Sequence, residues 1–402
     1  MNRRRGSITV VAVLLAVAIW ARWACGCSAF LASDGQVVLF GNNEDFWNPA
    51  TRMWTVPAVG QQYGRLYFGY DDLVPQGGMN EAGLVYDGFA KKPKPVVTSR
   101  DRPVFQGNLI DHAMATCGTV SEVTALFGRY NLELMESYNL MFADAGGNAI
   151  IIEGDHIVPK IGTFQVVTNF DLSEHPDGAN AYGEGDSCAR FQIASEMLAA
   201  TKSPTVERMR EVLAAVHAEG RSRTLYSNVY DLKRRVVHLY HYHDFAHEVV
   251  IDLARELRKG RHVVKLPSLF PRNFAYEAFL KEQGEALEKR RAERSSVDLP
   301  LATLARYVGT YQGPDGMLTV TLEGSSLFAG YAAFERAALS ASSENAFFLL
   351  RHTYDVDLAF QLGGAGEVTG VKIRTGEQEM TFPRIQWKLP GAEDSPPRTE
   401  NE

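Results

Sequence analysis

The chain has 402 residues, of which 45% are apolar and 22% are charged, and its formal net charge at pH 7 is -7. This composition is typical of a globular protein with room for about two domains, and it excludes a disordered chain. The acidic balance argues against nucleic-acid binding, because the basic runs beyond the N-terminus, 233–235 and 289–291, are short. We therefore expect no nucleic-acid partner.

The N-terminal segment 1–26 has the features of a secretory signal peptide. A positively charged stretch, 2–5, precedes an apolar run, 8–21, which is too short and too quickly interrupted to indicate a membrane span. Ala24 and Gly26 put small residues at the positions that a signal peptidase inspects, so cleavage after Gly26 would make Cys27 the first residue. The sequence predicts an exported protein, periplasmic or secreted, with no stable membrane insertion after cleavage.

Two other fates of this segment stay open. The run Ala24-Cys25-Gly26-Cys27 also resembles a lipoprotein signal, in which Cys27 would be lipidated and its amine acylated. An uncleaved segment would instead anchor the chain in a membrane. A free Cys27 differs from both, because it would carry a thiol and an unblocked amine in one residue.

From Cys27 to about Asp244 the sequence predicts strands and hairpins interrupted by helices. Hairpins are expected around the turns 33–35 and 144–148, and a further strand over 236–242. Helical periodicity marks 108–130, 188–200 and 206–217. Because strands flank helices without a regular βαβ alternation, an α+β layered domain with antiparallel sheets is predicted.

Composition divides the whole chain into five predicted segments. A charged, helix-favouring stretch follows the first domain, short β-type segments with turn residues recur after it, and the last residues are polar and proline-rich. The segments are a signal peptide (1–26), a first domain (27–252), a helical connector (253–298), a small antiparallel β-barrel or sandwich (299–388) and a disordered tail (389–402).

Cysteine and histidine spacing indicates no metal centre. After cleavage Cys117 and Cys188 can pair in an oxidising compartment, which leaves Cys27 as the odd thiol. No CxxC or HExxH motif occurs, and at most two of three histidines share a face of the strand predicted near them: His238, His241 and His243. We expect neither a metal site nor a cofactor.

Five short motifs occur in order between residues 27 and 231. The first is Cys27-Ser28-Ala29-Phe30, followed after the hairpin by Phe-Gly-Asn-Asn-Glu-Asp at 40–45. The others are Gly-Met-Asn-Glu-Ala-Gly-Leu at 78–84, Val-Thr-Asn at 167–169, Asp-Ser-Cys-Ala-Arg-Phe at 186–191 and Thr-Leu-Tyr-Ser-Asn-Val-Tyr-Asp at 224–231. This order resembles the choloylglycine hydrolase group of N-terminal-nucleophile hydrolases, which includes bile salt hydrolases and penicillin V acylases, and the related acyltransferases and ceramidases.

The resemblance implies catalytic roles for four residues. Cys27 matches the nucleophile, Asp45 the aspartate that holds the terminal amine, Asn169 the asparagine that donates to the oxyanion, and Arg190 the arginine that faces the nucleophile. A free α-amine has a pKa near ~8 and a thiol near ~8.5, so a carboxylate and a cation are needed to set the position of the proton.

Three more residues are placed at the substrate by the same resemblance, and two of them depart from the family pattern. Asn42 stands where the family has an arginine, which removes one charge from the pocket. Ala90 stands where bile salt hydrolases carry a second oxyanion asparagine. Asn80 lies in the motif 78–84, while the motif 224–231 is expected to be structural.

The resemblance implies a four-layer αββα sandwich, followed here by the small β domain, and hydrolysis of a linear, non-peptide C–N amide bond through an acyl-thioester on Cys27. The partner would be a small-molecule N-acyl amide, and the sequence is compatible with a homo-oligomer. Two alternatives stay open. The chain could be an acyltransferase that passes the acyl group to an amine, or a lipid-anchored, non-catalytic binding protein.

Overall fold

The computed structural model describes residues 26–178, 185–220, 222–313, 316–331, 334–352, 354–375 and 378–385. The chain divides into two compact units, with the boundary between Ala292 and Glu293. The predicted signal peptide, except for Gly26, and the predicted tail lie outside the described residues. The five predicted segments remain predictions.

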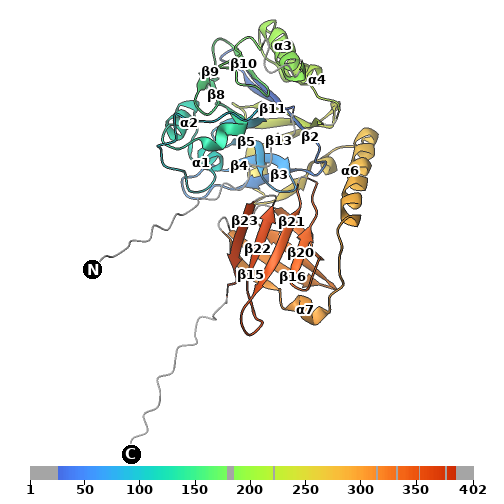
Figure 1. The fold of residues 1–402 in the computed structure, drawn as a ribbon. Coiled ribbons are helices and arrows are strands. Elements are labelled where there is room, and N and C mark those ends of the chain that lie inside the picture. The colour runs from blue at the N-terminus through green and yellow to red at the C-terminus, as the bar shows by residue number, and fades with distance from the viewer. Residues whose placement is uncertain are drawn as a thin grey trace, which may run out of the picture. The chain divides into compact units, whose positions relative to one another are not determined.

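Two antiparallel sheets form the centre of the first unit (Figure 1). The six-stranded sheet has the order β10 (Phe164–Val167), β1 (Ser28–Ser33), β2 (Val38–Phe46), β11 (Arg223–Asp231), β12 (Val236–His241), β13 (Asp244–Asp252). The eight-stranded sheet has the order β14 (Val263–Lys265), β3 (Thr51–Val56), β4 (Arg65–Tyr70), β5 (Pro75–Asn80), β6 (Val85–Ala90), β7 (Tyr138–Ala143), β8 (Ala149–Ile152), β9 (Ile157–Pro159).

The inner faces of the two sheets share one hydrophobic core. Side chains alternate along a strand, so Phe40 and Phe46 of β2 point into this core with Phe68 of β4. The ring of Phe68 lies 5.9 Å from that of Tyr226 and 6.1 Å from that of Tyr230, measured between centroids, which joins β4 of one sheet to β11 of the other. Each of these buried rings contributes about 2–3 kcal/mol through removal from water.

Separate hydrophobic clusters lie where helices pack on the sheets. One cluster combines α3 (Gly185–Ala199) and α4 (Val206–Ala215) with residues of the six-stranded sheet, such as Phe30 and Leu39. Another combines α1 (Leu109–Thr116) and α2 (Val120–Phe127) with the eight-stranded sheet. The first unit also contains α5 (Leu253–Leu257), α6 (Phe274–Ala292) and 3₁₀ turns over Glu133–Ser137 and Leu266–Leu269.

The second unit is built from two smaller antiparallel sheets. One has the order β15 (Gly309–Gly313), β16 (Gly316–Glu323), β17 (Ser326–Tyr331), β18 (Phe334–Ala338), and the other has the order β19 (Ser340–Ala341), β20 (Ala346–Leu349), β21 (Val356–Leu362), β22 (Val368–Thr375), β23 (Gln378–Pro383). A short helix, α7 (Leu301–Ala305), precedes them. A β-bridge between Tyr311 and Arg384 connects β15 to the residue after β23.

The expected α+β fold with antiparallel sheets is confirmed, and one expectation needs correction. The helix predicted over 108–130 is divided into α1 and α2, because Thr119 and Glu122 form a capping box that starts a new helix. Cys117 and Cys188, whose pairing the sequence leaves open, form no disulfide, and they belong to different hydrophobic clusters. Within the described residues, no helix is long and apolar enough to cross a membrane.

Candidate active site

Cys27 lies immediately before β1, where the chain enters the six-stranded sheet. The next residue, Ser28, pairs with Asn43 of β2, so Cys27 lies opposite Glu44. Its side chain belongs to the core between the two sheets and is only 3% exposed. Its Sγ lies 3.9 Å from the backbone carbonyl oxygen of Asp45, which can accept a weak hydrogen bond from the thiol.

Asp45 follows Glu44 in β2, so its side chain points to the opposite face of the strand from that of Glu44. One of its carboxylate oxygens faces Gly26. Oδ1 accepts a hydrogen bond from the Thr224 hydroxyl, beside a β-bulge in β11. Oδ2 is buried without a hydrogen-bond partner among the described residues, and it lies 2.8 Å from the position that a Cβ on Gly26 would take. Burial raises the pKa of Asp45 to about 6, although Arg190 and the Thr224 hydroxyl lower it.

Arg190 reaches the start of β1 from helix α3. It is buried, and its Nη1 donates to the carbonyl oxygen of Cys27 at 3.0 Å and to the Ser28 hydroxyl. Its Nη2 donates to Oδ1 of Asn169 at 3.0 Å, and its Nε lies 3.4 Å from a carboxylate oxygen of Asp186 one helical turn earlier. The guanidinium therefore holds Cys27, Ser28 and Asn169 in one arrangement.

Asn169 follows β10 and is half-buried. Its Nδ2 donates one hydrogen bond to the backbone carbonyl oxygen of Ala90 at 2.9 Å, and its backbone N–H donates to the Ser187 hydroxyl. Because an amide nitrogen has two hydrogens, one N–H of Asn169 remains for another acceptor. Ala90 presents a carbonyl oxygen here, so in the described contacts it accepts a hydrogen bond and supplies no oxyanion donor.

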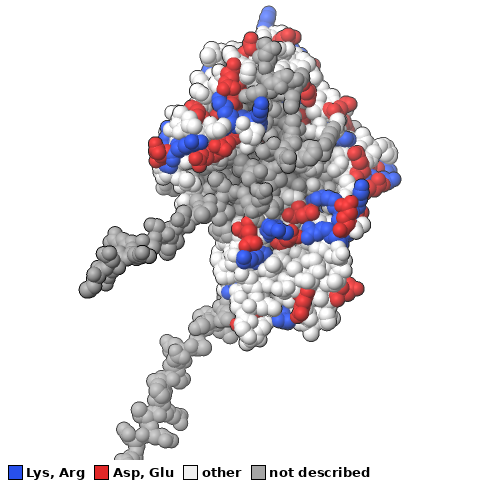
Figure 2. Space-filling model, in the orientation of Figure 1, with Lys and Arg blue, Asp and Glu red and all other residues white. Residues whose placement is uncertain are grey.

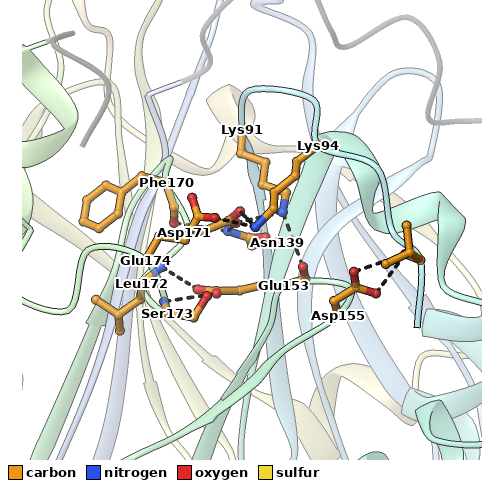
Figure 3. Close-up of polar contacts among 11 residues, drawn as sticks. Lys91, Lys94, Asn139, Glu153, Asp155, Phe170, Asp171, Leu172, Ser173 and Glu174 are labelled. Carbon is orange, nitrogen blue, oxygen red and sulfur yellow. Dashed lines mark hydrogen bonds and ion pairs between the residues drawn. The ribbon is translucent and has the colours of Figure 1, made fainter. Parts of the chain in front are cut away.

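A buried ionic network fixes the residues that follow Ala90 and Asn169 in the chain (Figure 3). Lys91 Nζ lies 2.7 Å from a carboxylate oxygen of Asp171, and both side chains are almost completely buried. Asn139 of β7 donates to the same carboxylate at 3.0 Å. Glu153 accepts from the backbone N–H groups of Leu172 and Ser173, which closes the loop after Asn169.

An acidic cluster, formed by Glu44, Asp87 and Asp45, lies around β2 and was not predicted from the sequence. Burial, and then the charge of Asp45, raise the pKa of Glu44 to about 8, although hydrogen bonds with Tyr70 and Cys27 lower it. Burial and then the charge of Glu44 raise the pKa of Asp87 well above its usual range, whereas a hydrogen bond with Asn42 lowers it. The available signal was the run of four consecutive polar residues at 42–45.

Asn42 is one of the predicted substrate residues and lies beside this acidic cluster. It is buried, and its Oδ1 accepts from the Nδ2 of Asn228 in β11 at 3.1 Å. The family arginine would place a cation among these carboxyl groups. With Asn42 there instead, the pKa values of Glu44 and Asp87 are set by burial, neighbouring carboxylates and hydrogen bonds.

Asn80 lies at the end of β5 and is not brought to Cys27. Its Nδ2 donates to the carbonyl oxygens of Met114 and Cys117, and its Oδ1 accepts from the N–H groups of Ala82 and Leu84. These contacts hold the end of α1 against the β5–β6 turn. They give the predicted substrate-binding role of Asn80 no support.

A pocket of about 700 Å³ lies elsewhere in the first unit and contains none of the predicted site residues. It lies near the start of α2 and the β7–β8 turn, where Asp144 already accepts hydrogen bonds from the N–H groups of Val120 and Gly146. Basic and acidic side chains are interspersed on the described surface shown in Figure 2, without a large patch of one sign. Neither feature alters the location of the candidate site.

Comparison with solved structures finds two kinds of similar protein. Penicillin V acylase from Agrobacterium tumefaciens is 18% identical, with a TM-score of 0.46 over 59% of this chain and 90% of that chain. Two variants of conjugated bile acid hydrolase from Clostridium perfringens are each 17% identical, with TM-scores of 0.47, over 62% and 61% of this chain and 97% of those chains. No family model matches the chain, and neither does any curated protein.

The resemblance predicted from the motifs is thus confirmed as a likeness to solved members of the same group. At these identities the likeness concerns the fold. The roles of individual residues must follow from their own geometry.

Proposed function

We propose that the chain is an exported amidohydrolase that cleaves a linear C–N amide bond of an N-acylated small molecule, with Cys27 as an N-terminal nucleophile. The observation that carries this proposal is the position of Asp45 Oδ2. This buried oxygen has no partner among the described residues and lies against Gly26, where cleavage would leave the α-amine of Cys27. An ammonium group there would provide the missing partner and lower the pKa of Asp45.

The proposed reaction uses one residue as nucleophile and base. The free amine of Cys27 takes the thiol proton, and the thiolate attacks the amide carbonyl carbon. The ammonium group returns a proton to the departing nitrogen as the C–N bond breaks, which leaves an acyl-thioester. Water, deprotonated by the same amine, then cleaves the thioester and releases a carboxylic acid, and Cys27 is restored.

The remaining polar residues would orient and stabilise this reaction. Asp45 and Thr224 would hold the ammonium group, and Arg190 would fix the carbonyl end of Cys27. The unused N–H of Asn169 would donate to the oxyanion, a contact that contributes about 3–4 kcal/mol where it has been removed in other enzymes. The first unit would correspond to a four-layer αββα sandwich, with α3 and α4 on one outer face and α1 and α2 on the other. The second unit would correspond to a small β-barrel-like domain.

The proposed substrate class rests on the apolar residues that pack with Cys27. Phe68 and Tyr226, one from each sheet, belong to the same hydrophobic core as Cys27, and such surroundings favour an apolar acyl group. The proposed partner is therefore a small-molecule N-acyl amide. Because the donor site is formed within one chain, an oligomer is not required for the chemistry.

The test combines N-terminal analysis with activity measurements. Intact mass of the secreted protein should show a chain that begins at unmodified Cys27. A panel of N-acyl amides (bile-acid conjugates, penicillin V, acyl-homoserine lactones and N-acyl amino acids) should include a substrate whose hydrolysis falls at least ~10²-fold in Cys27→Ser, because a serine hydroxyl is a far weaker nucleophile with an amine as its base.

Cys117→Ser is the matched control, since Cys117 is another buried free cysteine, and it should keep the activity. Full activity in Cys27→Ser, or in a protein whose Cys27 amine is acylated, would exclude the mechanism. Acyl transfer that outcompetes hydrolysis at modest concentrations of an added amine would make the enzyme an acyltransferase.

A further inference from the structure

We propose that His217, Glu219 and His243 form a binding site for a divalent transition metal ion, with Zn²⁺ as the ion best suited to it. One ligand atom from each of the three residues can be chosen so that all lie within 4.8 Å of one another. His217 and Glu219 follow helix α4, and His243 lies in the turn between β12 and β13. This site does not depend on the proposed amidohydrolase function.

His217 lies between a backbone carbonyl oxygen and a carboxylate. Nδ1 lies 2.6 Å from the carbonyl oxygen of Ala214, and because a carbonyl oxygen only accepts, Nδ1 carries the proton. Nε2 lies 2.9 Å from Oε1 of Glu219. In the neutral imidazole two acceptors would therefore face each other, and a cation between them would satisfy both. A histidine whose Nδ1–H is fixed by a carbonyl oxygen is the usual arrangement of a metal ligand.

His243 supplies the third donor. Its ring centroid lies 4.8 Å from that of His217, and its Nε2 is buried without a hydrogen-bond partner among the described residues. A buried ring nitrogen with no partner is costly unless something binds it. A metal ion held by both imidazoles would satisfy it.

The backbone of the turn is a second, independent observation. Tyr242 and His243 have φ values of 48° and 62°, the left-handed conformation in which two-residue hairpin turns normally carry Asn-Gly. This conformation costs roughly 1–2 kcal/mol for each ordinary L-residue. Such strain concentrates where a particular side chain is needed. Here it places the His243 imidazole against His217.

The donor set favours zinc over the harder cations. Two imidazoles and one carboxylate match zinc sites with three protein ligands, in which water occupies the fourth position. Calcium and magnesium prefer oxygen ligands alone. The nearby cation Arg223 is already engaged, because it donates to the Tyr242 hydroxyl and to the carbonyl oxygen of Gly220.

The same loop is hydrogen-bonded to the candidate catalytic aspartate. The N–H of Ala218, between two of the ligands, donates to the Thr224 hydroxyl at 2.9 Å, and this hydroxyl donates to Asp45. A bound metal ion would therefore immobilise the loop that holds Thr224. This relation is structural, and metal binding itself can be measured without any substrate.

The test is a titration of the metal-free, full-length protein with Zn²⁺ in the presence of a chromophoric chelator. We expect one equivalent to bind, and His217→Ala and His243→Asn to weaken binding by at least ~10-fold, since each removes one of the protein ligands. Asparagine at 243 tolerates the left-handed turn, which separates loss of the ligand from loss of the fold. Circular dichroism should show that both variants stay folded.

His262→Ala is the matched control. His262 also contacts a carboxylate, with Nε2 2.7 Å from Glu256, but it belongs to no three-ligand group among the described residues. It should bind one equivalent of Zn²⁺ like the wild type. Absence of stoichiometric binding in the wild type, or equal binding by the wild type and His243→Asn, would overturn the proposal.

Discussion

Arg190 donates a hydrogen bond from Nη1 to the backbone carbonyl oxygen of Cys27 at 3.0 Å. A second nitrogen of the same guanidinium binds Asn169, so one planar group fixes two residues of the candidate site. Lysine keeps the charge but has no planar fork, so it cannot hold both acceptors in this geometry. We expect Arg190→Lys to lower kcat about 10²-fold, close to the loss in Arg190→Ala, as measured on the best substrate of the panel.

Arg208→Lys provides the comparison for this prediction. Arg208 lies on the neighbouring helix α4, where it pairs with Glu211, and it touches none of the candidate site residues in the recorded contacts. Its replacement should leave kcat unchanged. If Arg190→Lys retained wild-type kcat, charge alone would account for the role of Arg190.

The pH dependence of stability should report the buried state of Glu44. Its native pKa of about 8 lies above the usual glutamate value of 4.5, so between these values the folded protein keeps a proton that the unfolded chain has lost. The contribution of this group is therefore present below pH 4.5 and is lost as the pH rises through about 8. The free energy of unfolding should fall by up to about 1.4 kcal/mol per pH unit from one such proton.

Glu44→Gln removes this proton and should flatten that slope. Urea unfolding at pH 5 and pH 7.5 should show the variant gaining stability relative to wild type at the higher pH. Glu282→Gln, at an exposed position on α6, is the control, and its free energy of unfolding should change with pH as it does in wild type. Parallel slopes for Glu44→Gln and wild type would mean that Glu44 is ionised in the native protein throughout this range.

The sequence predicted the four main residues of the candidate site but not the buried groups around them. The motifs identified Cys27, Asp45, Asn169 and Arg190, and the structure brings all four together. The burial of Glu44 could not be predicted, because its partner Tyr70 belongs to the other sheet. The packing of two sheets against each other leaves no local pattern in the sequence. His217 and His243 are similarly far apart in the chain and meet only because β11 and β12 pair.

The buried pair Lys91–Asp171 gives a prediction about stability. Removing one member leaves the other charge buried, so Lys91→Met should destabilise the protein by about 3–5 kcal/mol. The double variant Lys91→Met, Asp171→Leu should recover much of this loss, as measured by urea unfolding. Lys94→Met is the control, because Lys94 is 39% exposed, and it should cost less than about 1 kcal/mol. A double variant less stable than Lys91→Met alone would contradict this explanation.

Asn80 separates a structural role from substrate binding. Its side chain satisfies four buried backbone groups, those of Met114, Cys117, Ala82 and Leu84. Asn80→Ala leaves these groups without their partner and should lower the free energy of unfolding by about 3 kcal/mol, measured in urea. At a temperature where the variant remains folded, KM should match wild type, because Asn80 contacts α1 and not Cys27. A raised KM with unchanged stability would instead indicate that Asn80 binds the substrate, as its motif predicts.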